Sequence, residues 1–369
     1  MLKFSAKKIN PDYTLLGSAI ALVFLGIIVL ASVSTFVSQK LFGNTYHFLA
    51  HQLLLGLLPG LILGFLAFKI DLNYYRKYIP LLLLANLFLM LLVFLPIIGS
   101  SLGGASRWVH LGFISFQPSE FLKLTFILYL SSWLAAMMEG RRSVSSAFLP
   151  FIFIIIIISL FLVLQPDIGT LGIIVFSAVA MYFSASTSLW QTVLMILAGL
   201  GCLIALIKIA PYRCDRLLVF LKPETDPMGL GYHTKQALIA IGSGGIFGVG
   251  LGMSTQKYGL LPESISDSTF AVFAEETGFL GSILLIILFL LFLWRCFNVA
   301  KENKDKFSQL VAMGISSWIV FQGFINIGSM IGVLPLTGVP LPFISYGCSH
   351  LITELVAVGL LLNISKKPL

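Results

Sequence analysis

Apolar stretches of about 20 residues recur from one end of the chain to the other, with few charged residues between them. A helix of roughly 20 apolar residues is long enough to cross a hydrocarbon core of roughly 30 Å. Charged residues make up only 10% of the chain, whereas a soluble domain carries roughly 25%. The mean hydropathy of +1.00 agrees with this pattern. The sequence therefore predicts a polytopic membrane protein and not a string of soluble domains.

The spacing of these stretches predicts an all-α fold of about ten transmembrane helices, forming one integral membrane domain over residues 1–369. We place the helices at residues 14–37, 48–69, 79–98, 117–138, 147–165, 169–185, 188–210, 279–297, 308–330 and 350–364. The longest interruption, residues 211–277, predicts a large extracytoplasmic loop between helices seven and eight. Its apolar, Gly-rich stretch 236–253 is expected to lie at or partly within the membrane, where protein can cover the broken backbone.

The distribution of Lys and Arg predicts the orientation of the helices, because cytoplasmic loops are enriched in these residues. The segments that would lie inside hold most of them: Lys3, Lys7, Lys8, Lys69, Arg76, Lys77, Arg141, Arg142, Arg295, Lys301, Lys304, Lys306, Lys366 and Lys367. Both termini are therefore expected in the cytoplasm. The first apolar run is too long for a cleaved signal peptide, so we interpret it as a retained helix.

Composition also excludes some functions. The net charge of +8 is scattered between apolar spans, which does not indicate binding to nucleic acid. The four cysteines lack the spacing of a metal site, and three of them lie in or beside apolar spans, where a cysteine is usually a small buried hydrophobic residue. No repeat at fixed spacing supports an inverted-repeat transporter.

The first polar cluster lies at the outer entry of the fourth helix, in residues 103–123. Glu120 and Lys123 are three residues apart and share one helix face. They can form an internal ion pair, or Lys123 can extend toward the interface. Alternatively, Lys123 lines a cationic cavity with Arg107, on the preceding loop, as a second phosphate ligand. We favour this functional interpretation because ionisable residues within a membrane are usually functional.

Two further clusters follow. In Gln165-Pro166-Asp167, the aspartate is expected to form an Asx-turn or to cap the next helix, and we favour this structural role over a direct catalytic one. In the long outer segment, Arg213 and Arg216 are suited to bidentate phosphate binding. Asp267 begins an apolar run, so it can be a helix N-cap, a general base or a metal ligand, and spacing alone does not separate these roles.

The last polar features lie near two helix ends. Of the adjacent Glu275 and Glu276, we expect one to pair with a base inside the bundle and the other to be solvated. Prolines in residues 335–350 forbid a continuous helix, so this segment is expected to line the outer cavity. There Ser345, Tyr346 and Ser349 can contact a sugar or phosphate, although a structural re-entrant loop explains them nearly as well.

Five ordered motifs resemble the SEDS family of FtsW, RodA and SpoVE over nearly the whole chain. They are GASRWVHLG with FQPSEFLKL, then QPDIGT, then PYRCDRL with DPMGLGYHTKQALIAIGSGGIFGVGLG, then LPESISDSTFAVFAEETGFLG, and finally LPLTGVPLPFISYG. Members of this family are peptidoglycan glycosyltransferases with ten helices and a large outer loop. The resemblance implies polymerisation of lipid II into a nascent glycan outside the bacterial cytoplasmic membrane, with release of undecaprenyl pyrophosphate.

The resemblance also implies roles for individual residues. Asp267, in PESISD, matches the family's essential loop aspartate and would deprotonate the acceptor hydroxyl, directly or through a divalent cation, Mg²⁺ or Mn²⁺. A single displacement would invert the anomeric carbon. The departing pyrophosphate would be neutralised by four basic residues, Arg107, Lys123, Arg213 and Arg216. Glu120 and Gln236 would support them.

The tail motif departs from the family pattern SYGGSS, because Cys348 and His350 stand where a glycine and a serine are usual. The sequence around Asp267 and the motif AVFAEE resemble the division branch of the family more than the elongation branch. A class B penicillin-binding transpeptidase is the implied partner. Two other functions are weighed against the enzyme: a lipid II flippase, which would need polar groups reaching the inner face, and a non-catalytic scaffold of a division or elongation complex.

Overall fold

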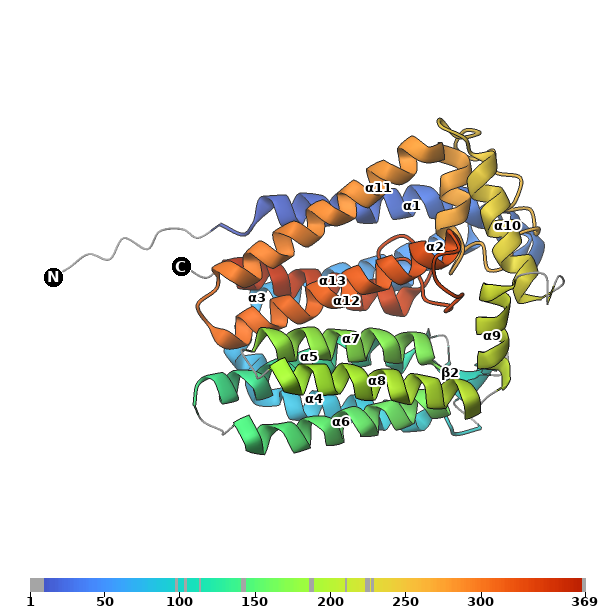
Figure 1. The fold of residues 1–369 in the computed structure, drawn as a ribbon. Coiled ribbons are helices and arrows are strands. Elements are labelled where there is room, and N and C mark those ends of the chain that lie inside the picture. Colours follow the sequence, from blue (N-terminus) through green and yellow to red (C-terminus); the bar gives the residue numbers. More distant parts are fainter. Residues whose placement is uncertain are drawn as a thin grey trace.

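The computed structural model describes residues 10–96, 99–102, 105–112, 114–140, 144–185, 189–209, 211–222, 226 and 229–366. It is a helical bundle with a small sheet and a loop-rich region at one end (Figure 1). The membrane-type helices before the long outer segment are α1 (Tyr13–Phe42), α2 (His47–His51), α3 (Leu58–Lys69), α4 (Leu72–Leu92), α5 (Pro118–Met138), α6 (Val144–Leu164), α7 (Ile168–Ser184) and α8 (Leu189–Ile209). The remaining helices are α9 (Pro211–Leu221), α10 (Leu230–Ser243), α11 (Thr269–Glu302), α12 (Lys306–Met330) and α13 (Cys348–Ser365).

Every segment predicted to be a transmembrane helix is helical for most of its length. Within the described residues, eight helices or runs of helix are long and apolar enough to cross a membrane, while α7 and the part of α6 from residue 151 are shorter. The third helix is shifted, since α4 begins at Leu72 and ends at Leu92. The second is continuous from α2 to α3 but passes through a π-helical turn, η1 (Gln52–Leu57). This turn precedes Pro59, which has no N–H to continue the regular α-helical pattern.

Small residues bring α3 and α13 into close contact. A Cβ added to Gly60 would lie 2.6 Å from a methyl carbon of Leu355, and one added to Gly359 would lie 2.1 Å from the carbonyl oxygen of Gly64. Glycine at these positions lets the two backbones approach, as is common for helices that pack within membranes. The approach fixes α13, and with it the non-helical segment that precedes α13.

The first and last described parts of the chain meet at one end of the bundle (Figure 1). The backbone N–H of Asp12 donates to Ser365 Oγ over 3.1 Å. Arg295, near the end of α11, pairs with the carboxylate of Asp12, which also caps α1 by accepting from the N–H groups of Thr14 and Leu15. All the segments discussed below as the functional site belong to the opposite end, which we call the loop end.

The loop end contains more regular structure than the sequence predicted. The described residues between 99 and 116, expected to be mostly loop, form a three-stranded antiparallel sheet in the order β1-β2-β3. Its strands are β1 (Gly99–Leu102), β2 (Ala105–Leu111) and β3 (Ile114–Phe116). Within the predicted loop 211–277, α9 lies across the end of the bundle and α10 packs beside the first turns of α11 (Figure 1). Helix α11 begins at Thr269, inside the segment predicted as loop, and kinks at Gly278.

Glu275 and Glu276 hold the turns between α10 and α11. Glu275 accepts hydrogen bonds from the N–H and hydroxyl of Thr255, at 3.0 and 2.9 Å, and from the hydroxyl of Ser254. Glu276 pairs with Lys257 over 2.9 Å, and both side chains are buried. The prediction that one glutamate pairs with a base is therefore confirmed. The prediction that the other is solvated is wrong, because backbone and hydroxyl donors satisfy Glu275 in the interior.

The Lys257–Glu276 pair gives a test of how this loop is held. Replacing Lys257 with Met leaves the Glu276 carboxylate buried without its counter-charge. Removing one partner of a buried ion pair lowers the free energy of unfolding by about 3–5 kcal/mol. We expect Lys257→Met to melt well below wild type in detergent. The double variant Lys257→Met/Glu276→Gln should recover part of the loss. Equal melting temperatures for wild type and Lys257→Met would show that the pair does not hold the loop.

Candidate functional site

The candidate site lies where two non-helical segments meet at the loop end. One segment is residues 262–268, just before α11, and the other is residues 335–346, just before α13. The N–H of Tyr346 donates to the carbonyl oxygen of Ile265 over 2.9 Å, which joins the two segments. Prolines in the second segment prevent it from continuing as helix, so its backbone groups are available to neighbouring side chains.

Asp267 lies at this junction. The N-cap of α11 is Ser268 and not Asp267, so the carboxylate is free of the capping role that spacing had allowed. A Cβ added to Gly338 would lie 3.3 Å from Asp267 Oδ2, and Gly338 has φ +72°. The carboxylate therefore packs against the backbone of the 335–346 segment at a position that favours glycine.

The surroundings of Asp267 change its acidity. Burial raises the pKa of Asp267 to about 7, and the nearby carboxylate of Glu263 also raises it. Arg107 and Arg216 lower the pKa of this group, and Asp167 raises it slightly. Both arginines are thus close enough to Asp267 to act on its charge, although they lie far from it in the sequence. An acid with a pKa near neutrality is suited to accept a proton at physiological pH.

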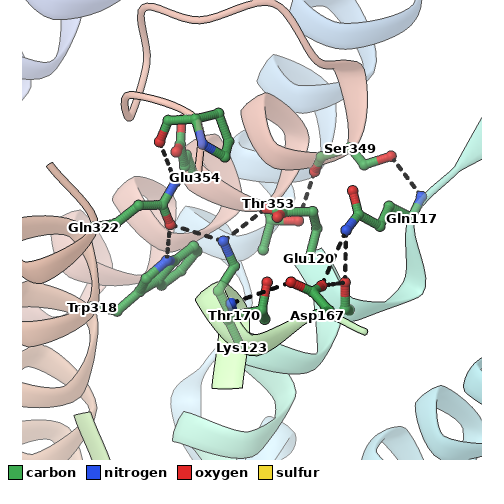
Figure 2. Close-up of polar contacts among 12 residues, drawn as sticks. Gln117, Glu120, Lys123, Asp167, Thr170, Trp318, Gln322, Ser349, Thr353 and Glu354 are labelled. Carbon is green, nitrogen blue, oxygen red and sulfur yellow. Dashed lines mark hydrogen bonds and ion pairs between the residues drawn. The ribbon is translucent and has the colours of Figure 1, made fainter. Parts of the chain in front are cut away.

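Arg107 is anchored by the turn between α6 and α7. On β2, its Nε donates to the carbonyl oxygen of Gln165 over 3.2 Å, and its guanidinium also donates to the carbonyl oxygen of Pro166. Asp167 caps α7 by accepting from the N–H of Thr170, and it accepts from Ser119 Oγ at 3.0 Å (Figure 2). The predicted capping role of Asp167 is confirmed.

The two arginines of α9 point to different places. Arg216 donates to the carbonyl oxygen of Leu336 over 3.3 Å, so it lies against the same segment as Asp267. It also lines a small cavity with Thr234, Leu334 and Pro335. Arg213 donates to the carbonyl oxygen of Leu206 on α8, over 2.8 Å. The structure therefore associates Arg216, but not Arg213, with the environment of Asp267.

Lys123 lies deeper, inside a network of polar side chains (Figure 2). Its ammonium pairs with Glu120 over 2.8 Å, donates to Gln322 Oε1 over 2.8 Å and lies 4.9 Å from the centre of the Trp318 ring. Lys123 and Glu120 are both buried. This is the internal ion pair that the sequence had offered as the alternative to a cavity wall, and in this arrangement Lys123 exposes no surface to a ligand.

Ser345 and Gln236 complete the residues singled out from the sequence. Ser345 is buried, and its hydroxyl accepts from the N–H of Leu341 over 2.9 Å, so it stabilises the turn of the 335–346 segment. Gln236 is half-buried on α10. Its neighbour one turn earlier, His233, contacts Ser268 Oγ through Nε2 at 2.6 Å. Burial lowers the pKa of His233.

Several residues of the site were missed in the sequence. Gln322 and Asn326 lie four residues apart in the apolar helix α12, and both side chains are buried. Their spacing places them on one helix face, and polar residues within a membrane span are a signal that could have identified them. Lys257 and His233 carried no comparable signal, because they lie in a loop and in an outer helix. Among the described residues, no three of His, Cys, Asp and Glu are grouped so as to hold a metal ion.

The fold and site define a multi-pass membrane protein in which one acid and two arginines from distant segments lie close enough at one end of the bundle to interact electrostatically. Residues 13–368 match the family model FTSW_RODA_SPOVE, described as cell cycle protein. The chain belongs to this family, as the motifs predicted.

Individual relatives agree with this assignment. The chain is 38% identical to stage V sporulation protein E of Bacillus subtilis, covering 98% of this chain and 99% of the relative. It is 39% identical to a probable peptidoglycan glycosyltransferase FtsW of Coxiella burnetii, covering 99% of each. The identities to these sporulation and division relatives differ by only one percentage point, so the assignment to the division branch stays a prediction.

Solved structures resemble the fold over almost its full length. One comes from a study of the structural coordination of polymerization and crosslinking by a peptidoglycan synthase complex; it has a TM-score of 0.77 at 28% identity and covers 96% of this chain and 97% of the other. The rod shape determining protein RodA of Thermus thermophilus has a TM-score of 0.70 at 27% identity, with coverage of 99% and 98%. The multi-pass, helical membrane fold is therefore shared with RodA.

The raised pKa of Asp267 predicts a pH-dependent stability. Because the pKa in the folded state is about 7 and the ordinary value is 3.8, ionising Asp267 costs folding free energy. The cost is absent below about pH 4, grows as the pH rises toward 7, and is complete above it. We expect Asp267→Asn to melt above wild type at pH 8 and to lose this advantage near pH 4. An advantage that is the same at both pH values would contradict the assignment.

Proposed function

We propose that this chain is a glycosyltransferase that polymerises lipid II into glycan strands at the outer face of the bacterial cytoplasmic membrane. The relatives named as peptidoglycan glycosyltransferases support the reaction class. The observation that supports the site is the convergence of Asp267, Arg107 and Arg216, with a carboxylate of pKa about 7. The loop end would face outward and both termini would lie in the cytoplasm, in keeping with the Lys and Arg distribution.

In the proposed reaction Asp267 accepts a proton from the acceptor sugar hydroxyl. The hydroxyl oxygen forms a bond to the anomeric carbon of the donor as the bond from that carbon to the pyrophosphate oxygen breaks. Undecaprenyl pyrophosphate leaves, and a single displacement inverts the anomeric centre. The negative charge that develops on the leaving group is stabilised by guanidinium groups already in place, and Arg107 and Arg216 are the best placed for this role.

A divalent cation fits this site only with help from the substrate. Asp267 offers one carboxylate, and Mg²⁺ is commonly bound by one or two carboxylates together with substrate phosphates. Such an ion, when bound, would neutralise the diphosphate. Asp267 would then hold the ion while the arginines position the remaining oxygens.

A class B penicillin-binding transpeptidase is the proposed partner, because one structurally similar chain comes from a peptidoglycan synthase complex.

Polymerisation by the purified protein tests the role of Asp267. With labelled lipid II, wild type should form glycan chains, and Asp267→Ala should be about 10²–10⁴-fold slower because it lacks the base. The wild-type rate should rise with pH through an apparent pKa near 7, since only the ionised carboxylate accepts a proton. Asp305→Asn is the matched control, because Asp305 caps α12 at the far end and Asn caps equally well. A wild-type rate from Asp267→Ala would remove this residue from the mechanism.

The two arginines of α9 give a second test. Arg216→Gln should lower kcat/KM roughly 10–100-fold, the range expected for a lost charge-assisted hydrogen bond. It should also move the pH–rate profile to higher pH, because Arg216 lowers the pKa of Asp267. Arg213→Gln removes the same charge three residues away, where it contacts α8, and should leave the profile in place. If the two variants give the same shift, net charge and not position determines the effect.

A further inference from the structure

Helix α12 carries two buried amide side chains that bind the backbone of the site, and one of them, Asn326, contacts both segments. Asn326 Nδ2 donates to the carbonyl oxygen of Asp267 and to that of Val339, each over 2.8 Å. An amide nitrogen carries two hydrogens, so both are used and each goes to a different segment. One side chain thus ties the backbone of Asp267 to the segment against which its carboxylate packs.

Gln322, one turn earlier on the same face, makes a similar connection. Its Nε2 donates to the carbonyl oxygen of Pro340 over 3.0 Å. Its Oε1 accepts from Lys123 Nζ at 2.8 Å and from Trp318 Nε1 at 2.7 Å. Figure 2 shows Gln322 between Lys123 and Trp318. The donors around Oε1 therefore fix which way the Gln322 amide faces, and Gln322 links Lys123 to the 335–346 segment.

We propose that Asn326 is a positioning residue that sets the place of Asp267 by fastening residue 267 and residue 339 to one point on α12. This inference rests on the proposed function, because it concerns the base of that reaction. Asn326 is buried, so it is not placed to touch the substrate itself. The carbonyls of Asp267 and Val339 are acceptors, so a side chain without donors cannot replace it.

Loss of the bridge should change the chemistry at Asp267 and not only the amount of folded protein. Without Asn326, the 262–268 segment can separate from Gly338, and water can reach the Asp267 carboxylate. Hydration favours the ionised form, so the acid limb of the pH–rate profile should move to lower pH. A displaced base is also less effective in the transition state, which lowers kcat while leaving KM nearly unchanged.

Asn363 provides a matched control within the same chain. Its Nδ2 also donates to two backbone carbonyls, those of Ala67 at 2.9 Å and Ile70 at 2.5 Å, but at the end of the bundle that holds the termini. Asn363→Ala therefore removes the same kind of bridge without touching the loop end. It reports what loss of such a bridge does to stability alone.

The experiment compares Asn326→Ala, Asn326→Ser and Asn363→Ala in lipid II polymerisation, with rates normalised to folded protein by size exclusion and thermal melting. We expect Asn326→Ala to lose about 10- to 100-fold in kcat, with KM within about twofold and the acid limb moved to lower pH. Asn326→Ser, which keeps one donor, should fall between it and wild type, and it decides the question if Asn326→Ala does not fold. Asn363→Ala should keep the wild-type profile.

Two results overturn the inference while leaving the proposed function intact. One is a wild-type kcat and pH profile from both Asn326 variants, and the other is the same loss of kcat and the same shift from Asn363→Ala. Inactivity of wild-type protein toward lipid II would instead count against the proposed function itself. The wild-type arm therefore separates the two failures.

Discussion

The proposed function depends on one electrostatic constraint: the buried Asp267 carboxyl must be able to ionise near neutral pH if it is to act as a base. Burial disfavours the ionised form of Asp267, and the nearby arginines favour it. The structure combines the two, because burial raises the pKa of Asp267 while Arg107 and Arg216 lower it. The balance near 7 exists only if segments that are far apart in sequence are held together, so much of the loop end can be understood as the framework for this one group.

That framework is built by polar side chains that bind backbone, and not by charge pairs alone. Arg107 holds the Gln165 carbonyl, Arg216 holds that of Leu336, and Asn326 holds those of Asp267 and Val339. Non-helical backbone at the end of a membrane bundle leaves carbonyl groups without partners. The same side chains that satisfy these groups also place the charges. Stability and function are therefore coupled here, in contrast to the close contact of α3 and α13, which serves packing.

The sequence predicted the membrane class and the helical segments, because these follow from local patterns. Apolar runs specify helices directly, and the motif around Asp267 identified it by resemblance. What local patterns could not supply was the partner of each charge. In the sequence, Lys123 and Arg107 are both cations near the start of the same helix. In the structure, Lys123 is buried against Gln322, whereas Arg107 contacts the turn between α6 and α7. Arg213 and Arg216 are only three residues apart, yet they donate to carbonyl groups in different parts of the fold, because tertiary packing decides which carbonyl each side chain reaches.

The most direct test of this account is the titration of the Asp267 carboxyl itself. Infrared difference spectra of wild type minus Asp267→Asn, recorded in detergent from about pH 5 to about pH 9, isolate the C=O stretch of the protonated acid. The account predicts a band that is present at low pH and disappears with an apparent pKa of about 7. A carboxyl that is already ionised at pH 5, or still protonated at pH 9, would contradict it.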